Sequence, residues 1–147
     1  MTGPGAEQGG ALTLHASAVA WQGRAALILG PSGSGKSALA LNLMALGAVL
    51  VADDRVRVSV EGSRLIAASP EVIRGRIEAR GIGILNAEAI DRAELALVVD
   101  LSATETERLP PWREFRLFER VLPLVHRVES GHFPAAILQY LKAGRNA

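Results

Sequence analysis

The sequence predicts an α/β fold built on a mixed sheet with flanking helices. Two continuous apolar runs, at 25–29 and 94–101, are typical of strands buried on both faces. A glycine-rich loop at 30–35 separates the first run from a helical pattern, so the order is strand, loop, helix, strand. Residues 55–60 alternate in polarity and 64–67 can return beside them as an antiparallel hairpin.

The other expected elements follow from periodicity and from the positions of glycine and proline. Leu39, Leu43 and Leu46 recur at helical spacing, which predicts a helix that ends before Gly47. The remaining expectations are a strand at 12–19, the helix at 36–46, a buried strand at 48–52, a short helix or irregular turn at 71–80, a weak helix at 87–93, a loop at 102–113, a last strand at 121–125 and a closing helix at 134–142.

Composition limits the class of protein. A chain of 147 residues, 49% hydrophobic, suits one domain, expected at 11–147 after a flexible tail at 1–10. The net charge of +1, without basic clusters, gives no indication of a nucleic-acid partner. The absence of cysteine excludes disulfides and thiolate metal sites and fits a reducing cytoplasm. The sequence contains no apolar run of the roughly 20 residues that span a bilayer, and its N-terminus does not resemble a signal peptide.

The loop sequence GPSGSGKS matches the phosphate-binding pattern G-x-x-x-x-G-K-[ST] in full. Its glycines let several backbone N–H groups face one anion, and the helix that follows adds its positive end. The Lys36 ammonium can reach the β- and γ-phosphates and the Ser37 hydroxyl can coordinate Mg²⁺. A chance glycine-rich turn is the alternative, but the strand before it and the helix after it favour nucleotide binding. The expected nucleotide-binding residues are Gly30, Pro31, Ser32, Gly33, Ser34, Gly35, Lys36 and Ser37, and the loop does not indicate which nucleotide they hold.

Two adjacent carboxylates, Asp53 and Asp54, follow the strand at 48–52. Ligands of open α/β sheets bind beyond the carboxyl ends of strands, which places this pair near the γ-phosphate. One can hold Mg²⁺ through water and the other can accept a proton from an attacking hydroxyl. The alternative is a solvated acidic turn paired with Arg55 or Arg57, and Asp100, at the end of another apolar strand, is a rival acid.

Three further features remain ambiguous when they are considered alone. The segment IEARGIGILN, at 77–86, places charges between apolar residues and fits a surface turn or a site equally well. His15, in an expected strand, is more simply a hydrogen-bonded structural histidine, and Arg108, in a polar loop, an exposed arginine. Trp21 and Trp112 are most simply packing residues.

Taken together, these motifs resemble the HPr kinase/phosphorylase family. GPSGSGKSALALNLMALGAVLVADDRV is similar to the family's G-D-S-G-x-G-K-S, helix, glycine and L-V-A-D-D, with the same spacing from Ser37 to Asp54. IEARGIGILN resembles the family signature I-E-I-R-G-L-G-I-I-N. Shorter matches are LHA at His15, for L-H-G, and ERLP at Arg108, for D-R-L-G.

The resemblance implies a cytoplasmic serine kinase that uses ATP and Mg²⁺ to phosphorylate the phosphocarrier protein HPr of the phosphotransferase system. The fold it implies is a kinase domain of the HPr kinase and phosphoenolpyruvate carboxykinase type, and the assembly a homo-oligomer, a hexamer in the family. Carried over by position, Lys36 binds phosphate and Ser37 and Glu78 hold the metal. Asp54 is the proton acceptor, with His15 and Arg108 as auxiliary catalytic residues.

The sequence also departs from the family pattern. The resemblance does not include the family's usual N-terminal domain, so a short member limited to the kinase domain is expected. Pro31 replaces an aspartate and Ala38 a glutamate, and the segment between 86 and 94 is shorter. The C-terminal motif P-V-R-P-G-R-N, tied to dephosphorylation, is degraded, with His132 where an arginine stands. Weak or absent phosphorylase activity is therefore expected.

Two other functions compete with the protein kinase. A small-molecule P-loop kinase needs an arginine-bearing lid, for which Arg113 and Arg116 are the candidates. A regulatory module that binds a nucleotide without catalysis is the non-enzyme alternative. An ABC-type ATPase is excluded because the chain is too short and has no L-S-G-G-Q stretch.

Overall fold

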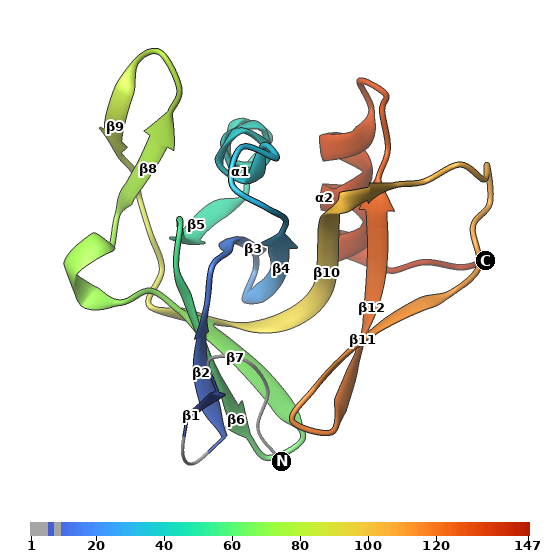
Figure 1. The fold of residues 1–147 in the computed structure, drawn as a ribbon, viewed down its shortest axis with the longest axis horizontal. Helices are drawn as coiled ribbons and strands as arrows, with labels where there is room; N and C mark the ends of the chain where they lie inside the picture. Colours follow the sequence, from blue (N-terminus) through green and yellow to red (C-terminus); the bar gives the residue numbers. More distant parts are fainter. Residues whose placement is uncertain (1–5, 8–9) are drawn as a thin grey trace.

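A curled sheet with both helices on one side makes up the protein (Figure 1). The structure is a computed structural model that describes residues 6–7 and 10–147. The strand order of the main sheet is β1-β2-β6-β7-β10-β4-β3-β5, and β12 and β11 extend it from β10. Most of the flexible tail expected at 1–10 lies outside the described residues, although β1 (Ala6–Glu7) pairs with β2 (Ala11–Leu14).

The long strand β10 (Arg92–Thr104) joins the parts of this sheet. Its first residues pair antiparallel with β7 (Arg64–Ala68), and its middle pairs parallel with β4 (Arg24–Leu29). Its end pairs parallel with β12 (Arg120–Arg127), which carries β11 (Arg113–Leu117) on its other side. This parallel centre explains the two continuous apolar runs, since parallel strands are covered on both faces.

Hydrophobic residues fill both faces of the sheet. On one face α1 (Lys36–Ala45) and α2 (Phe133–Ala143) pack their leucines and isoleucines against β3 (Ser17–Trp21), β4 and β10. The other face holds a second cluster, which the curl of the sheet through β6 (Val56–Glu61), β7 and the β11–β12 hairpin encloses. The helix layer matters for function because α1 begins directly after the glycine-rich loop.

Several expected elements are confirmed, with bounds that differ by one or two residues. They are the strand at 25–29 (β4), the helix at 36–46 (α1), the strand at 48–52 (β5, Val49–Ala52), the hairpin of β6 and β7, the last strand at 121–125 (β12) and the closing helix at 134–142 (α2). No helix in the part of the chain that the structure describes is long and apolar enough to cross a membrane.

Four expectations were wrong in whole or in part, because pairing with other strands overrides local pattern. The strand at 12–19 is two strands, since the chain turns at His15 and the amide of Ala16 bonds the carbonyl of Asp54. The helix or irregular turn at 71–80 is a short 3-10 helix, Glu71–Ile73, followed by strand β8 (Arg76–Ala79). The weak helix at 87–93 is extended chain that bridges Ala89 to Leu50, and the loop at 102–113 loses its ends to β10 and β11.

Strand β8 forms a separate two-stranded hairpin with β9 (Gly83–Asn86). Figure 1 shows this hairpin projecting from the sheet beside α1. The segment IEARGIGILN is therefore a β-hairpin next to the helix of the phosphate loop. Its alternating charges and glycines gave no clear period, which is why sequence pattern alone missed it.

Candidate active site

The glycine-rich loop joins β4 to α1 in the geometry of an anion-binding turn. Gly33 and Gly35 have φ of 83° and 100°, a region that favours glycine. Gly35 is the N-cap of α1, and within the described part of the chain no side chain caps this end and no acid lies in the first turn. The first amides of a helix have no partner within it, so these N–H groups and the positive helix end are available to an anion.

Lys36, the first residue of α1, lies across this loop. Its Nζ donates to the carbonyl of Gly30 at 2.7 Å and to that of Pro31 at 3.1 Å. The residue is only 8% exposed, so its ammonium is held where the loop closes. The lysine thus places a fixed positive charge beside the loop amides.

Asp53 is the structural centre of the site. Its Oδ1 accepts hydrogen bonds from the hydroxyls of Ser17 and Ser37, both at 2.7 Å, and its Oδ2 accepts one from the amide of Glu78 at 3.0 Å. These donors come from β3, α1 and β8, while Asp53 itself follows β5. One buried carboxylate therefore ties the loop helix, the sheet and the β8–β9 hairpin together.

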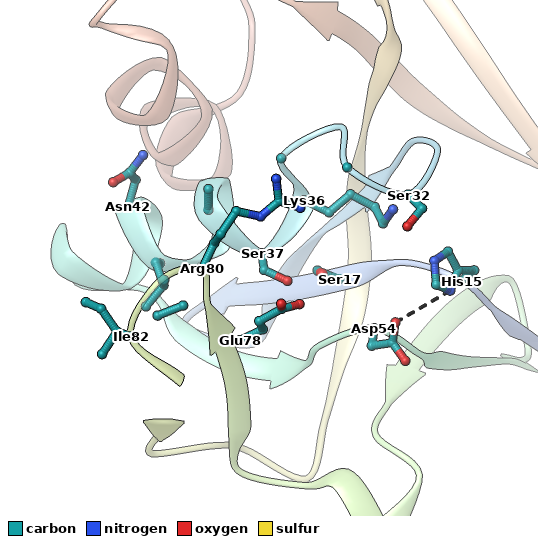
Figure 2. Close-up of a pocket in the computed structure, with 15 residues that line it drawn as sticks. His15, Ser17, Ser32, Lys36, Ser37, Asn42, Asp54, Glu78, Arg80 and Ile82 are labelled. Carbon is teal, nitrogen blue, oxygen red and sulfur yellow. Dashed lines mark ion pairs between the residues drawn. The ribbon is translucent and has the colours of Figure 1, made fainter. Parts of the chain in front are cut away.

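Asp54 is directed differently from its neighbour. Its side chain is 61% exposed and lies 3.6 Å from His15 Nδ1 and 3.7 Å from Arg55 Nε (Figure 2). Its φ of 73° is a left-handed conformation that aspartate adopts more readily than most residues. The turn that separates the two side chains leaves the Asp53 carboxylate buried and hydrogen-bonded and the Asp54 carboxylate exposed at the pocket.

A cavity of about 490 Å³ is lined by most of the predicted site residues, although Gly30, Pro31, Ser34 and Asp53 do not line it. Loop residues 32, 33 and 35, together with Lys36 and Ser37, line it on one side, Asp54 and His15 at one end, and Glu78 opposite the helix. Figure 2 shows Lys36, Ser37 and Glu78 between the His15–Asp54 pair and the far end of the pocket. The hairpin thus brings Glu78, 41 positions after Ser37 in the chain, to the start of α1.

Other candidate residues lie elsewhere. Arg108 is exposed in the segment between β10 and β11 and does not line the cavity. Asp100, the rival acid, accepts hydrogen bonds from the amide and hydroxyl of Ser102 and does not line it either. His132 precedes α2 and bonds the Ser130 hydroxyl at 2.7 Å. Trp21 packs under Lys142, as expected for a packing residue.

The segment that carries Arg108 is anchored at both ends. At its start Arg113 donates two hydrogen bonds of 3.1 Å to the Glu105 carboxylate and holds the pKa of that group below its usual range. Nearer its end Arg145 stacks 4.1 Å over the Trp112 ring and bonds the carbonyl of Pro110. These contacts fix both ends of the segment.

Arg127 contacts the phosphate loop from a distant part of the chain. From the end of β12 it donates to the carbonyl of Ser34, inside the phosphate loop, at 2.5 Å, and to that of Leu101 at 3.2 Å. It is 93 residues away from Ser34 in the chain, so no local pattern indicates the contact. Ser17, which supports Asp53, was missed for the same reason.

The donor set fits a nucleotide that brings Mg²⁺ with it. Among the described residues, no group of three histidines, cysteines or acids is arranged to hold a metal ion. Mg²⁺ usually binds through one or two protein groups, waters and the phosphates of its substrate. The two protein groups that suit this mode are the Ser37 hydroxyl, in the first turn of α1, and the Glu78 carboxylate, which strand β8 brings to the same cavity.

Comparison with known proteins agrees with this geometry. The model of the HPr Serine kinase C-terminal domain matches residues 9–111. The chain belongs to this family. It is 38% identical over 114 residues to the HPr kinase/phosphorylase of Thermoanaerobacter sp. (strain X514), and 35% identical over 142 residues to that of Acidovorax sp. (strain JS42). These alignments cover 75% and 86% of this chain.

The family fold extends over nearly the whole molecule. The structure of the Hpr(Ser) kinase/phosphatase from Coxiella burnetii superposes with a TM-score of 0.74 at 25% identity, covering 88% of this chain and 93% of that one. The expected α/β kinase-domain fold is thereby confirmed. The chain spans only 36% and 45% of the lengths of the two curated relatives named above.

Proposed function

We propose that this protein is an ATP- and Mg²⁺-dependent serine kinase that phosphorylates an HPr-type phosphocarrier protein of the phosphotransferase system. The observation that carries the proposal is that two adjacent aspartates at one phosphate loop have different surroundings. Asp53 is buried and holds Ser37, while Asp54 is exposed and faces the same cavity. Family membership adds the substrate class, since the curated relatives are named HPr kinase/phosphorylase.

Each residue has a role in the proposed transfer. The serine hydroxyl of the phosphocarrier attacks the γ-phosphorus, the bond to the β-phosphate oxygen breaks, and the hydroxyl proton passes to the Asp54 carboxylate. His15, 3.6 Å from Asp54, stabilises the carboxylate and helps to orient it. Lys36 and the loop amides balance the charge that develops on the phosphate oxygens. Mg²⁺ held by Ser37 and Glu78 would supply further charge neutralisation.

The two rival functions have less support. Arg113 and Arg116, the lid candidates of a small-molecule kinase, lie in strand β11 and pair with Glu105 and Glu114. A strand in the sheet is a poor lid. A non-catalytic nucleotide module gives no reason for an exposed carboxylate beside the loop, whereas a kinase requires one.

Three finer parts of the proposal rest on family membership and on this chain's departures from it. Phosphorylase activity is weak or absent because the C-terminal arginine motif is degraded. The site of action is the cytoplasm, where the phosphocarrier is found. The protein assembles as a homo-oligomer, which light scattering of the purified protein would test.

Arg108 contributes to the reaction only if its loop approaches the cavity when the phosphocarrier binds.

The decisive experiment incubates the purified protein with labelled ATP, Mg²⁺ and HPr-type phosphocarriers. Label transferred to serine of a phosphocarrier, and lost when that serine is replaced by alanine, supports the proposal. ATP consumed equally with and without a phosphocarrier, or label found only on a small molecule, would exclude it.

A further inference from the structure

The cavity extends well beyond the atoms that phosphoryl transfer needs. From the phosphate loop it continues along α1 to Leu41 and Asn42, and across to Ala79, Arg80 and Ile82 of the β8–β9 hairpin. Figure 2 shows Asn42 and Ile82 at the end opposite His15 and Asp54, with Ser37 and Glu78 between. The mechanism proposed above uses none of the residues at this far end.

The two ends of the cavity differ in chemistry. One end carries the Asp54 carboxylate and His15. The far end is formed by the aliphatic side chains of Leu41 and Ile82 and by the Asn42 carboxamide. The Arg80 side chain instead extends from the hairpin back toward Lys36 and Ser37 (Figure 2). An aliphatic pair with one amide suits an aromatic heterocycle, because the walls provide apolar contact and the amide can donate and accept hydrogen bonds.

Helix geometry places these groups on one surface. Positions 38, 41 and 42 are three and four residues apart, so their side chains share a face of α1. This face points toward the turn of the β8–β9 hairpin, because both line the same cavity. At 1.5 Å per residue, Asn42 lies about 7.5 Å along the helix from Ser37. The far end is therefore within reach of a group attached to phosphates on the loop.

The orientation of the triphosphate follows from the proposed function, on which this step rests. If the γ-phosphate is transferred beside Asp54, the phosphate chain runs over the loop away from that carboxylate. Its α-phosphate and nucleoside then point toward Ala38 and Asn42. We infer that the groove between α1 and the β8–β9 hairpin, formed by Leu41, Asn42 and Ile82, is the nucleoside subsite of this protein.

The subsite has two consequences. Ile82 is 79% exposed, so the base would cover apolar surface that the free protein leaves in water, and the nucleoside adds affinity to that of the phosphates. Asn42 is also exposed, and it is the one carboxamide on this wall among the described residues. One amide at an open rim reads a base edge weakly, so ATP and GTP should bind with similar affinity.

The test compares ATP with tripolyphosphate, which has the phosphates without the nucleoside. Calorimetric titration in Mg²⁺ is expected to show ATP binding at least about tenfold more tightly to the native protein. Ile82→Ala should weaken ATP about three- to tenfold, the loss expected for truncating a partly covered aliphatic side chain, and leave tripolyphosphate unchanged. Asn42→Ala should act in the same direction.

The control is Ile84→Ala, which removes the same side chain from the same hairpin at a residue that is 66% exposed and does not line the cavity. It should change neither ligand. Three results would overturn the inference. The first is that the native protein binds ATP and tripolyphosphate equally well, and the second is that Ile82→Ala weakens the binding of both ligands equally. The third is an increased KM for the phosphocarrier in Ile82→Ala while its affinity for ATP is unchanged. Binding without transfer to a phosphocarrier would instead refute the proposed function and leave the subsite intact.

Discussion

The Ser37 hydroxyl donates a 2.7 Å hydrogen bond to Oδ1 of Asp53. The same oxygen accepts the hydroxyl of Ser17, and the second oxygen accepts the amide of Glu78. A buried carboxylate that already accepts three hydrogen bonds has a positioning role, since most of its roughly four acceptor sites are occupied. The base of the proposed reaction is therefore its exposed neighbour, Asp54.

Replacing each aspartate by asparagine should separate these roles. Asp54→Asn should leave the Kd for ATP and Mg²⁺ within about twofold and slow the transfer by about 10²–10⁴-fold, the usual contribution of a general base. Asp53→Asn should lower thermal stability and weaken nucleotide binding, because an amide group cannot accept all three hydrogen bonds. Titration and single-turnover transfer measure both effects. The assignment would be reversed if Asp54→Asn transferred phosphate at the native rate, while Asp53→Asn was slow and still bound ATP with native affinity.

Lys36→Ala should abolish measurable nucleotide binding and transfer. The change removes the fixed charge at the loop, and no other lysine lines the cavity among the described residues. Titration of ATP measures the effect. Lys142→Ala, which removes a lysine that lies over Trp21, is the matched control and should bind ATP normally. Native ATP affinity in Lys36→Ala would contradict the assignment of the loop.

Glu78→Gln should raise the Mg²⁺ concentration needed for half-maximal transfer. The transfer rate at saturating Mg²⁺ should change by a smaller factor. The amide keeps the size of the side chain and removes its negative charge, which Mg²⁺ prefers in a ligand. Glu88→Gln, an exposed glutamate outside the cavity, is the control. An unchanged Mg²⁺ dependence would remove Glu78 from the metal site.

Local pattern predicted the parts of the fold that depend on local contacts. The buried runs of β4 and β10 and the leucine spacing of α1 could be read directly, as could the glycine-rich turn between β4 and α1. The β8–β9 hairpin and strand β11 could not be predicted in this way. Their sequences show no clear strand periodicity, and hydrogen bonding to a partner strand gives them their extended structure. The same limit applied to the break at His15, which depends on a hydrogen bond from Ala16 to Asp54.

The site divides in the same way. Lys36, Ser37, Asp53 and Asp54 belong to motifs whose spacing indicates their chemistry, and the structure gathers them at one cavity or directly beneath it. Glu78 joined them only through the family resemblance, since its own segment was ambiguous. Contacts made across the sheet, such as that of Arg127 with the loop, leave no trace in spacing, so only the three-dimensional structure shows them.

Arg127 should act as a positioning residue for the phosphate loop. Arg127→Ala removes two hydrogen bonds to backbone carbonyls, one of them in the loop, and should raise the Kd for ATP and for tripolyphosphate alike. Arg127→Lys keeps the charge and one donor and should restore part of the affinity. Arg116→Ala, an exposed arginine in β11, is the control. Loss of thermal stability with unchanged affinity would show a merely structural role.

The direction of catalysis depends on the arginines that remain near the site. Phosphorolysis brings inorganic phosphate beside a phosphoserine, and two anions held together need additional permanent cations such as guanidinium groups. Where the family motif carries arginine, this chain has His132, which bonds Ser130 outside the cavity. Arg127 and Arg145 could replace it only by leaving their present contacts with Ser34 and with Trp112.

We therefore expect little pyrophosphate when the protein is incubated with phosphoserine-HPr and inorganic phosphate under conditions that support forward transfer. Arg80 is the one arginine that lines the cavity among the described residues, so any residual reverse reaction should depend on it. Arg80→Gln should remove this remaining reverse activity, whereas Arg145→Gln should not. Robust pyrophosphate release would show that phosphorolysis does not need the lost arginine motif.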